Sequence, residues 1–153
     1  MGDRYLFRGK RIDNGEWVEG SLVTGVFFRL GQEIPYMFCP NLADYDCFED
    51  FSEENGIFEV EPSTICQYTG LKDKNGKLIW ENDIVDGHIK RGAAFRSCVV
   101  LWNECKARFD IRAVDCNFPM TLDECVDDIS VDGLDYEVLG NKFDNPELLE
   151  VRL

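Results

Sequence analysis

The sequence predicts a mainly β fold with at most short helices. Short apolar stretches recur along the 153 residues and are separated by turns rich in Asn, Asp and Gly. This pattern is typical of antiparallel strands in a small barrel or sandwich. Hydrophobic residues make up 44% of the chain and aromatic residues 12%, which favours a packed core over disorder. A chain of this length can bury roughly 70% of the surface that its unfolded form exposes.

The N-terminus is predicted to form a β-hairpin from residues 5–12 and 17–23. These stretches flank Asn14-Gly15, and this dipeptide readily adopts the positive φ angles of tight hairpin turns. Apolar residues at 26–28 and 34–38 predict another strand pair, with Pro35 keeping its strand at an edge or a bend because proline donates no backbone hydrogen bond. Residues 57–68 are expected to be extended.

The second half of the chain repeats the strand and turn pattern. Residues 73–76 are predicted to form a turn in which Gly76 takes the left-handed conformation. A capping box from Thr121 to Glu124 predicts one short helix, and Asn145 followed by Pro146 predicts a final helical turn. Residues 78–80 are expected to form a short strand or a turn segment. The strands expected in this half are residues 81–85, 99–102, 107–113, 129–131 and 136–140.

The formal net charge of −14 is unevenly distributed along the chain. Residues 41–62 contain eight acids and no Lys or Arg, and residues 121–150 contain ten acids and a single Lys. Between them, residues 72–112 contain nine bases and six acids. A uniformly acidic surface would repel nucleic acid and anionic lipid, but the centre of this sequence is mildly basic between two acidic blocks.

Seven cysteines at irregular spacings form no Cys-x-x-Cys pair. The chain has no signal peptide and no long apolar stretch, so we expect free, buried thiols in a reducing cytosol and no membrane association. A cytoplasmic location, in a bacterial host, is the resulting expectation.

Three segments resemble the YopX family of phage and prophage proteins. The first runs from Thr64 to Val85 and reads TICQYTGLKDKNGKLIWENDIV. The others are residues 7–22, which contain FRGKR and GEWVEGSL, and residues 136–149, YEVLGNKFDNPELL. The family usually shows Gly where this chain has Asn82. Asn is the residue besides Gly that best tolerates a left-handed backbone, so we expect the turn to be kept.

The resemblance implies two modules and a mobile-element origin. Residues 1–80 would form an N-terminal β region of hairpins, and residues 81–153 a C-terminal SH3-like β-barrel. The resemblance implies no activity, because the family has no agreed catalytic residues.

We find no recognisable catalytic constellation, metal site or cofactor motif, and therefore expect a protein that is not an enzyme. His88 is the single histidine, and a solvated loop position explains it better than a nucleophile pair or a zinc site with Cys98 and Cys105. Asp44 and Asp46 begin like a calcium loop, but the later ligands of such a loop are missing.

Two surfaces are candidates for binding. An acidic and aromatic loop could contact a protein partner, because rigid aromatic side chains supply contact energy and acids steer basic partners. Its residues are Asp44, Tyr45, Asp46, Phe48, Glu49, Asp50 and Phe51. A central basic set could bind nucleic acid together with exposed aromatic residues, and it comprises Lys90, Arg91, Arg96, Arg108 and Arg112. The competing interpretation, which we favour, is that Trp80 and Trp102 belong to the core and that the bases are solvated or ion-paired.

The sequence therefore favours a phage or prophage accessory protein that acts through contacts with a protein partner or through self-assembly as a homo-oligomer. A nucleic-acid-binding SH3-like module is the first alternative. An acidic protein that mimics DNA is the second.

Overall fold

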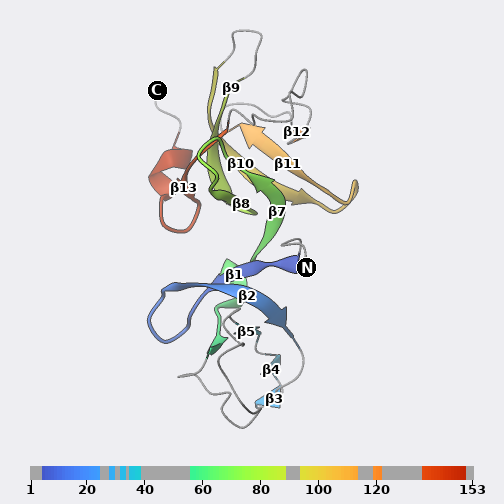
Figure 1. Ribbon diagram of the computed structural model, residues 1–153, viewed down its shortest axis with the longest axis vertical. Helices are drawn as coiled ribbons and strands as arrows, with labels where there is room; N and C mark the ends of the chain where they lie inside the picture. Colours follow the sequence, from blue (N-terminus) through green and yellow to red (C-terminus); the bar gives the residue numbers. More distant parts are fainter. Residues whose placement is uncertain are drawn as a thin grey trace. The chain divides into compact units, whose positions relative to one another are not determined.

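Figure 1 shows the computed structural model of the chain. The residues that it describes are 5–24, 28–29, 32–33, 35–38, 56–88, 94–113, 119–121 and 136–150. The chain divides into two compact units, Met1–Tyr68 and Thr69–Leu153. The division falls within strand β7 (Cys66–Lys72), whereas we expected a boundary after residue 80.

The first unit contains an antiparallel sheet with the order β6-β5-β2-β1, and the start of β7 pairs with β1. Phe28–Arg29 and Gln32–Glu33 form a separate two-stranded ladder, β3 and β4. The elements of the main sheet are β1 (Phe7–Lys10), β2 (Trp17–Val23), β5 (Tyr36–Phe38) and β6 (Ile57–Glu59), followed by the 3-10 helix η5 (Pro62–Thr64).

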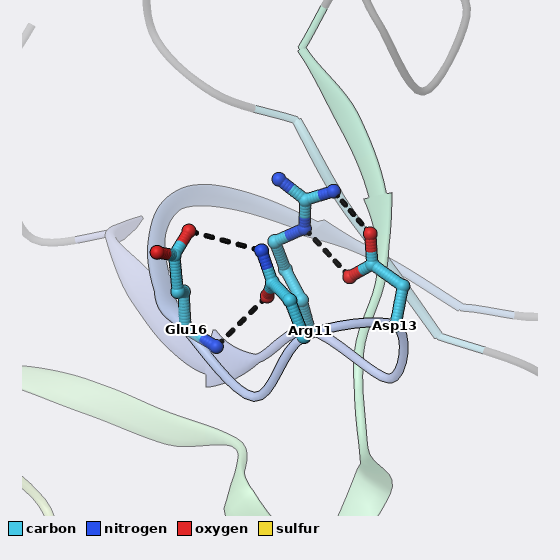
Figure 2. Close-up of polar contacts among 4 residues, drawn as sticks. Arg11, Asp13 and Glu16 are labelled. Carbon is cyan, nitrogen blue, oxygen red and sulfur yellow. Dashed lines mark hydrogen bonds and ion pairs between the residues drawn. The ribbon is translucent and has the colours of Figure 1, made fainter.

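The predicted N-terminal hairpin is confirmed. β1 pairs with β2 in the register Phe7↔Gly20 to Lys10↔Trp17, and Gly15 has a φ of 73°. Figure 2 shows how side chains close the turn: the guanidinium of Arg11 binds the carboxylate of Asp13, and the amide of Asn14 binds Glu16. The Arg11 hydrogen bond lowers the pKa of Asp13.

Two expectations for the first unit were wrong. The described parts of the stretches at 26–28 and 34–38 do not pair with each other, because Phe28 pairs with Glu33 and β5 pairs with β2 and β6. Pro35 precedes β5, so its missing N–H leaves the ladder intact although β5 is an inner strand. Residues 57–68 are not continuously extended, because Pro62 starts η5 and the carboxylate of Glu61 accepts a hydrogen bond from the Ser63 N–H.

The second unit contains a five-stranded antiparallel sheet with the order β12-β11-β10-β9-β13. Four consecutive strands form a meander and the last strand returns to pair with the first, which is the strand order of an SH3-like barrel. The mainly β fold class is therefore confirmed. The elements are β8 (Leu78–Trp80), β9 (Asp83–His88), β10 (Ala94–Asn103), β11 (Arg108–Ala113), β12 (Pro119–Thr121), β13 (Glu137–Asn141) and the 3-10 helix η6 (Pro146–Leu149).

The core of the second unit gathers apolar side chains from several strands and from the residue before β13. Trp80 is also buried, as the competing interpretation of the aromatic residues required. Cys66 and Cys98 are buried free thiols as expected, but Cys105 is exposed because it lies in the turn after β10. The core side chains are Ile79, Val85, Cys98, Val100, Ile111 and Tyr136.

The turn before β9 is kept with Asn82 in the position where the family usually has Gly. Asn82 has a φ of 65°. Its backbone N–H donates to the carbonyl of Val100 at 2.8 Å, and its carbonyl accepts from the N–H of Lys142 at 3.0 Å. Asn82, in its left-handed conformation, is therefore hydrogen-bonded both to β10 and to the segment after β13.

The predicted helical turn near the C-terminus is confirmed as η6, with Pro146 in the first turn. Asn145 does not cap η6 with its side chain. Its Oδ1 atom instead accepts a hydrogen bond from the N–H of Asn141, at 3.3 Å. Thr121 lies in β12, and the remainder of the predicted capping box and the strand at 129–131 lie outside the described residues.

Candidate functional site

The β10–β11 hairpin of the second unit carries the candidate site. Its register runs from Cys98↔Ala113 to Asn103↔Arg108, and Ala107 closes the turn with a φ of 51°. In Figure 1 the turn, coloured gold, extends to the right of the second unit, away from η6 in red. Because side chains alternate between the faces of a strand, the hairpin presents two different surfaces.

On one face of the hairpin, the buried core side chains are followed toward the turn by an exposed tryptophan. Val100 and Ile111 are cross-strand partners in the core, and Trp102 and Phe109 are the next pair on that face. The two rings meet edge to face with their centroids 5.0 Å apart, yet 41% of Trp102 remains exposed. The expectation that Trp102 is a core residue was therefore wrong, because the hairpin carries it beyond the end of the sheet core.

The other face carries a hydrogen-bonded polar network centred on Asp110. The carboxylate of Asp110 accepts from Arg108 Nε at 3.0 Å and from Asn103 Nδ2 at 2.6 Å. Only 4% of Asp110 is exposed. A buried carboxylate with two partners holds the strand ends together, and it also neutralises the charge of Arg108.

An open surface hollow of about 320 Å³ lies at this hairpin. Its lining residues include one half-buried apolar residue, one exposed cation, two acidic residues and the exposed tryptophan. Arg112 is exposed and forms no ion pair with any residue of the described ranges. The lining residues are Leu101, Trp102, Asn103, Glu104, Asp110 and Arg112.

The structure describes only part of the predicted basic set. Arg108 and Arg112 lie on one face of β11, with Asp110 between them. Arg96 lies in β10, but its side chain is outside the described residues, as are Lys90 and Arg91. The two described members therefore differ: Arg108 is ion-paired with Asp110, whereas Arg112 forms no ion pair within the described part of the chain.

The predicted acidic loop, residues 44–51, lies outside the described residues. His88 is placed as the last residue of β9, opposite Ala94, and its side chain is likewise outside them. Among the residues with described side chains, no three His, Cys, Asp or Glu gather as metal ligands would. No helix within the described ranges is long and apolar enough to cross a membrane.

Sequence reasoning did not single out Leu101, Asn103, Glu104 or Asp110. The alternation of apolar and polar residues along 99–112 could have indicated which side chains share the outer face. The hairpin register, which sets Asn103 opposite Arg108, could not be read from the sequence alone.

An SH3-like antiparallel sheet with an exposed aromatic hairpin defines this chain as a small β protein. A family model described as YopX protein matches residues 6–150, so the chain belongs to the YopX protein family. It is also similar to the crystal structure of protein EF1440 from Enterococcus faecalis, with 23% identity and a TM-score of 0.45. That match covers 94% of this chain and 96% of the other. No curated protein matches the chain at a significant level.

Proposed function

We propose that this protein is a phage or prophage accessory protein without enzymatic activity, which binds a partner protein in the host cytosol through the β10–β11 hairpin. The observation that carries the proposal is the exposed Trp102, fixed by its contact with Phe109. An aromatic side chain that is already fixed by a neighbouring ring loses little conformational entropy on binding. Trp and Arg are among the residue types that most often contribute most of the binding energy at protein interfaces.

The hollow beside Trp102 supports the same proposal. Arg112 offers a planar guanidinium that no described carboxylate occupies, and Leu101 adds apolar surface. A mixture of apolar, cationic and acidic groups is typical of protein contacts. A strand of nucleic acid places a negative charge at every nucleotide and would meet Glu104 and Asp110 here, so nucleic acid is the less favoured partner.

The test is co-purification with host lysate under matched conditions, quantified by mass spectrometry. Trp102→Ala and Arg112→Ala should each lower the recovery of the bound partner about tenfold or more, because truncating a hot-spot residue of an interface costs about 2 kcal/mol or more. Ile12→Ala is the control for Trp102→Ala, since Ile12 is another exposed apolar residue. Lys72→Ala is the corresponding control for Arg112→Ala, since Lys72 is an exposed cation.

The proposal fails if every variant recovers the same proteins as the wild type. Binding to short DNA or RNA at low salt, lost with rising salt and with Arg112→Glu, would instead favour the nucleic-acid alternative.

A further inference from the structure

Strand β13 is the outermost described strand of its sheet, because it pairs with β9 on one side alone. The free edge of an outer strand presents backbone N–H and C=O groups that can pair with a strand of another molecule. In this chain the edge of β13 is covered by the turn formed by residues 73–77.

The turn binds one backbone group of β13 and one of the residue before this strand. The N–H of Val138 donates to Asp73 Oδ2 at 3.1 Å, and the carbonyl of Tyr136 accepts from the N–H of Lys74 at 2.9 Å. The Lys74 ammonium also forms an ion pair with Glu137. At the other end of β13, Asn145 Oδ1 accepts from the N–H of Asn141.

The Asp73 carboxylate also builds the turn that covers the edge. Its Oδ1 atom accepts from the N–H of Asn75 at 2.8 Å and from that of Lys77 at 2.9 Å. Only 6% of Asp73 is exposed. Loss of this single carboxylate would therefore free the Val138 N–H and loosen the turn in one step.

The strand behind the turn is suited to pairing with itself. Leu139 is a large apolar residue with 42% of its surface exposed. β13 is irregular at Leu139, because its register with β9 shifts between Val138 and Gly140. If this irregularity straightens, an antiparallel pair of β13 strands centred on Val138 places Glu137 opposite Leu139 of the partner subunit, so that like charges do not face each other. A two-fold axis makes such a contact self-complementary.

We propose that the turn at residues 73–77 guards the edge of β13 against strand pairing with a second copy of this chain. Asp73 is the residue whose hydrogen bonds hold this turn against β13. The edge of β13 is separate from the β10–β11 hairpin of the proposed function, so a test of one proposal does not decide the other.

The experiment compares Asp73→Ala with Asp110→Ala by sedimentation velocity over a range of protein concentrations. Asp110 is an equally buried carboxylate with two described side-chain partners, but it lies on the inner strand β11. Asp73→Ala should shift from the monomer mass toward twice that mass as concentration rises, whereas the wild type and Asp110→Ala should not. Adding Leu139→Lys to Asp73→Ala should restore the monomer, because a charged edge residue opposes strand pairing.

Hydrogen exchange at the Val138 amide locates the contact. In Asp73→Ala this amide should exchange faster than in the wild type at low concentration and regain protection at high concentration. If Asp73→Ala does not fold, Asp73→Asn serves instead, since its amide oxygen keeps one acceptor and loosens the edge in part. A folded variant that stays monomeric at every concentration overturns the proposal. Equal association of Asp110→Ala, or no effect of Leu139→Lys, overturns it as well.

Discussion

Asp73 Oδ2 accepts a hydrogen bond from the backbone N–H of Val138, 65 residues further along the chain. The same carboxylate binds the N–H groups of Asn75 and Lys77. A single side chain thus sets a local turn and fixes the last strand of the sheet to it. This contact lies within the segments that carry the family resemblance, and it gives one of their acidic residues a structural role.

Replacing Asp73 with Ala should lower the free energy of unfolding by about 2–3 kcal/mol, because three backbone N–H groups lose their acceptor at a largely buried position. Chemical denaturation at low protein concentration measures the loss. Glu150→Gln, at an exposed position, should change the stability by less than about 0.5 kcal/mol. Equal stabilities of the two variants would contradict this role of Asp73.

The contribution of Asp73 to stability should depend on pH. Burial raises the pKa of its carboxyl, but the N–H groups of Val138, Lys77 and Asn75 together bring the pKa below the ordinary value of 3.8. A carboxyl whose pKa is lower in the folded state stabilises the fold above its unfolded pKa and loses this effect as the pH falls through the folded pKa. The stability difference between wild type and Asp73→Asn should therefore be constant near neutral pH and shrink below about pH 4. A difference that is unchanged down to pH 2 would refute this.

Asn82 should tolerate Gly better than Ala. Its φ of 65° lies in the left-handed region, where a residue with a Cβ and no local polar compensation is strained by about 1 kcal/mol. Thermal unfolding of Asn82→Ala and Asn82→Gly should rank Ala as the less stable of the two. The reverse order would show that the side chain, and not the backbone conformation, decides this position.

Gly140→Ala should destabilise the second unit through a clash with Asn145. A Cβ at Gly140 would lie 2.2 Å from Asn145 Oδ1 and 2.7 Å from its Cγ. The Asn145 amide would have to leave the Asn141 N–H, which it now binds. In a double-mutant cycle, Gly140→Ala should cost clearly less in an Asn145→Ala background than alone. Additive effects would mean that the clash is relieved without loss of that bond.

Local sequence chemistry was sufficient to predict most of the strands and their turns. Gly15 and Gly76 have the positive φ angles that their turn motifs require, at 73° and 81°. Pro146 begins the last helical turn. These features depend on neighbouring residues, so they are encoded in short stretches and can be predicted without knowledge of the fold.

What the sequence determined by itself was the mainly β class, the family resemblance and the conformation of Asn82. The tertiary structure alone decided which strands pair, for example that β5 pairs with β2 and not with the preceding stretch. It also decided that Trp102 lies exposed while Trp80 is buried. The hydrogen bond from the Val138 N–H to Asp73 is a third such feature. The physical reason is that strand pairing and burial depend on contacts between residues far apart in the chain. The same alternating pattern is compatible with several partners until the whole sheet is assembled.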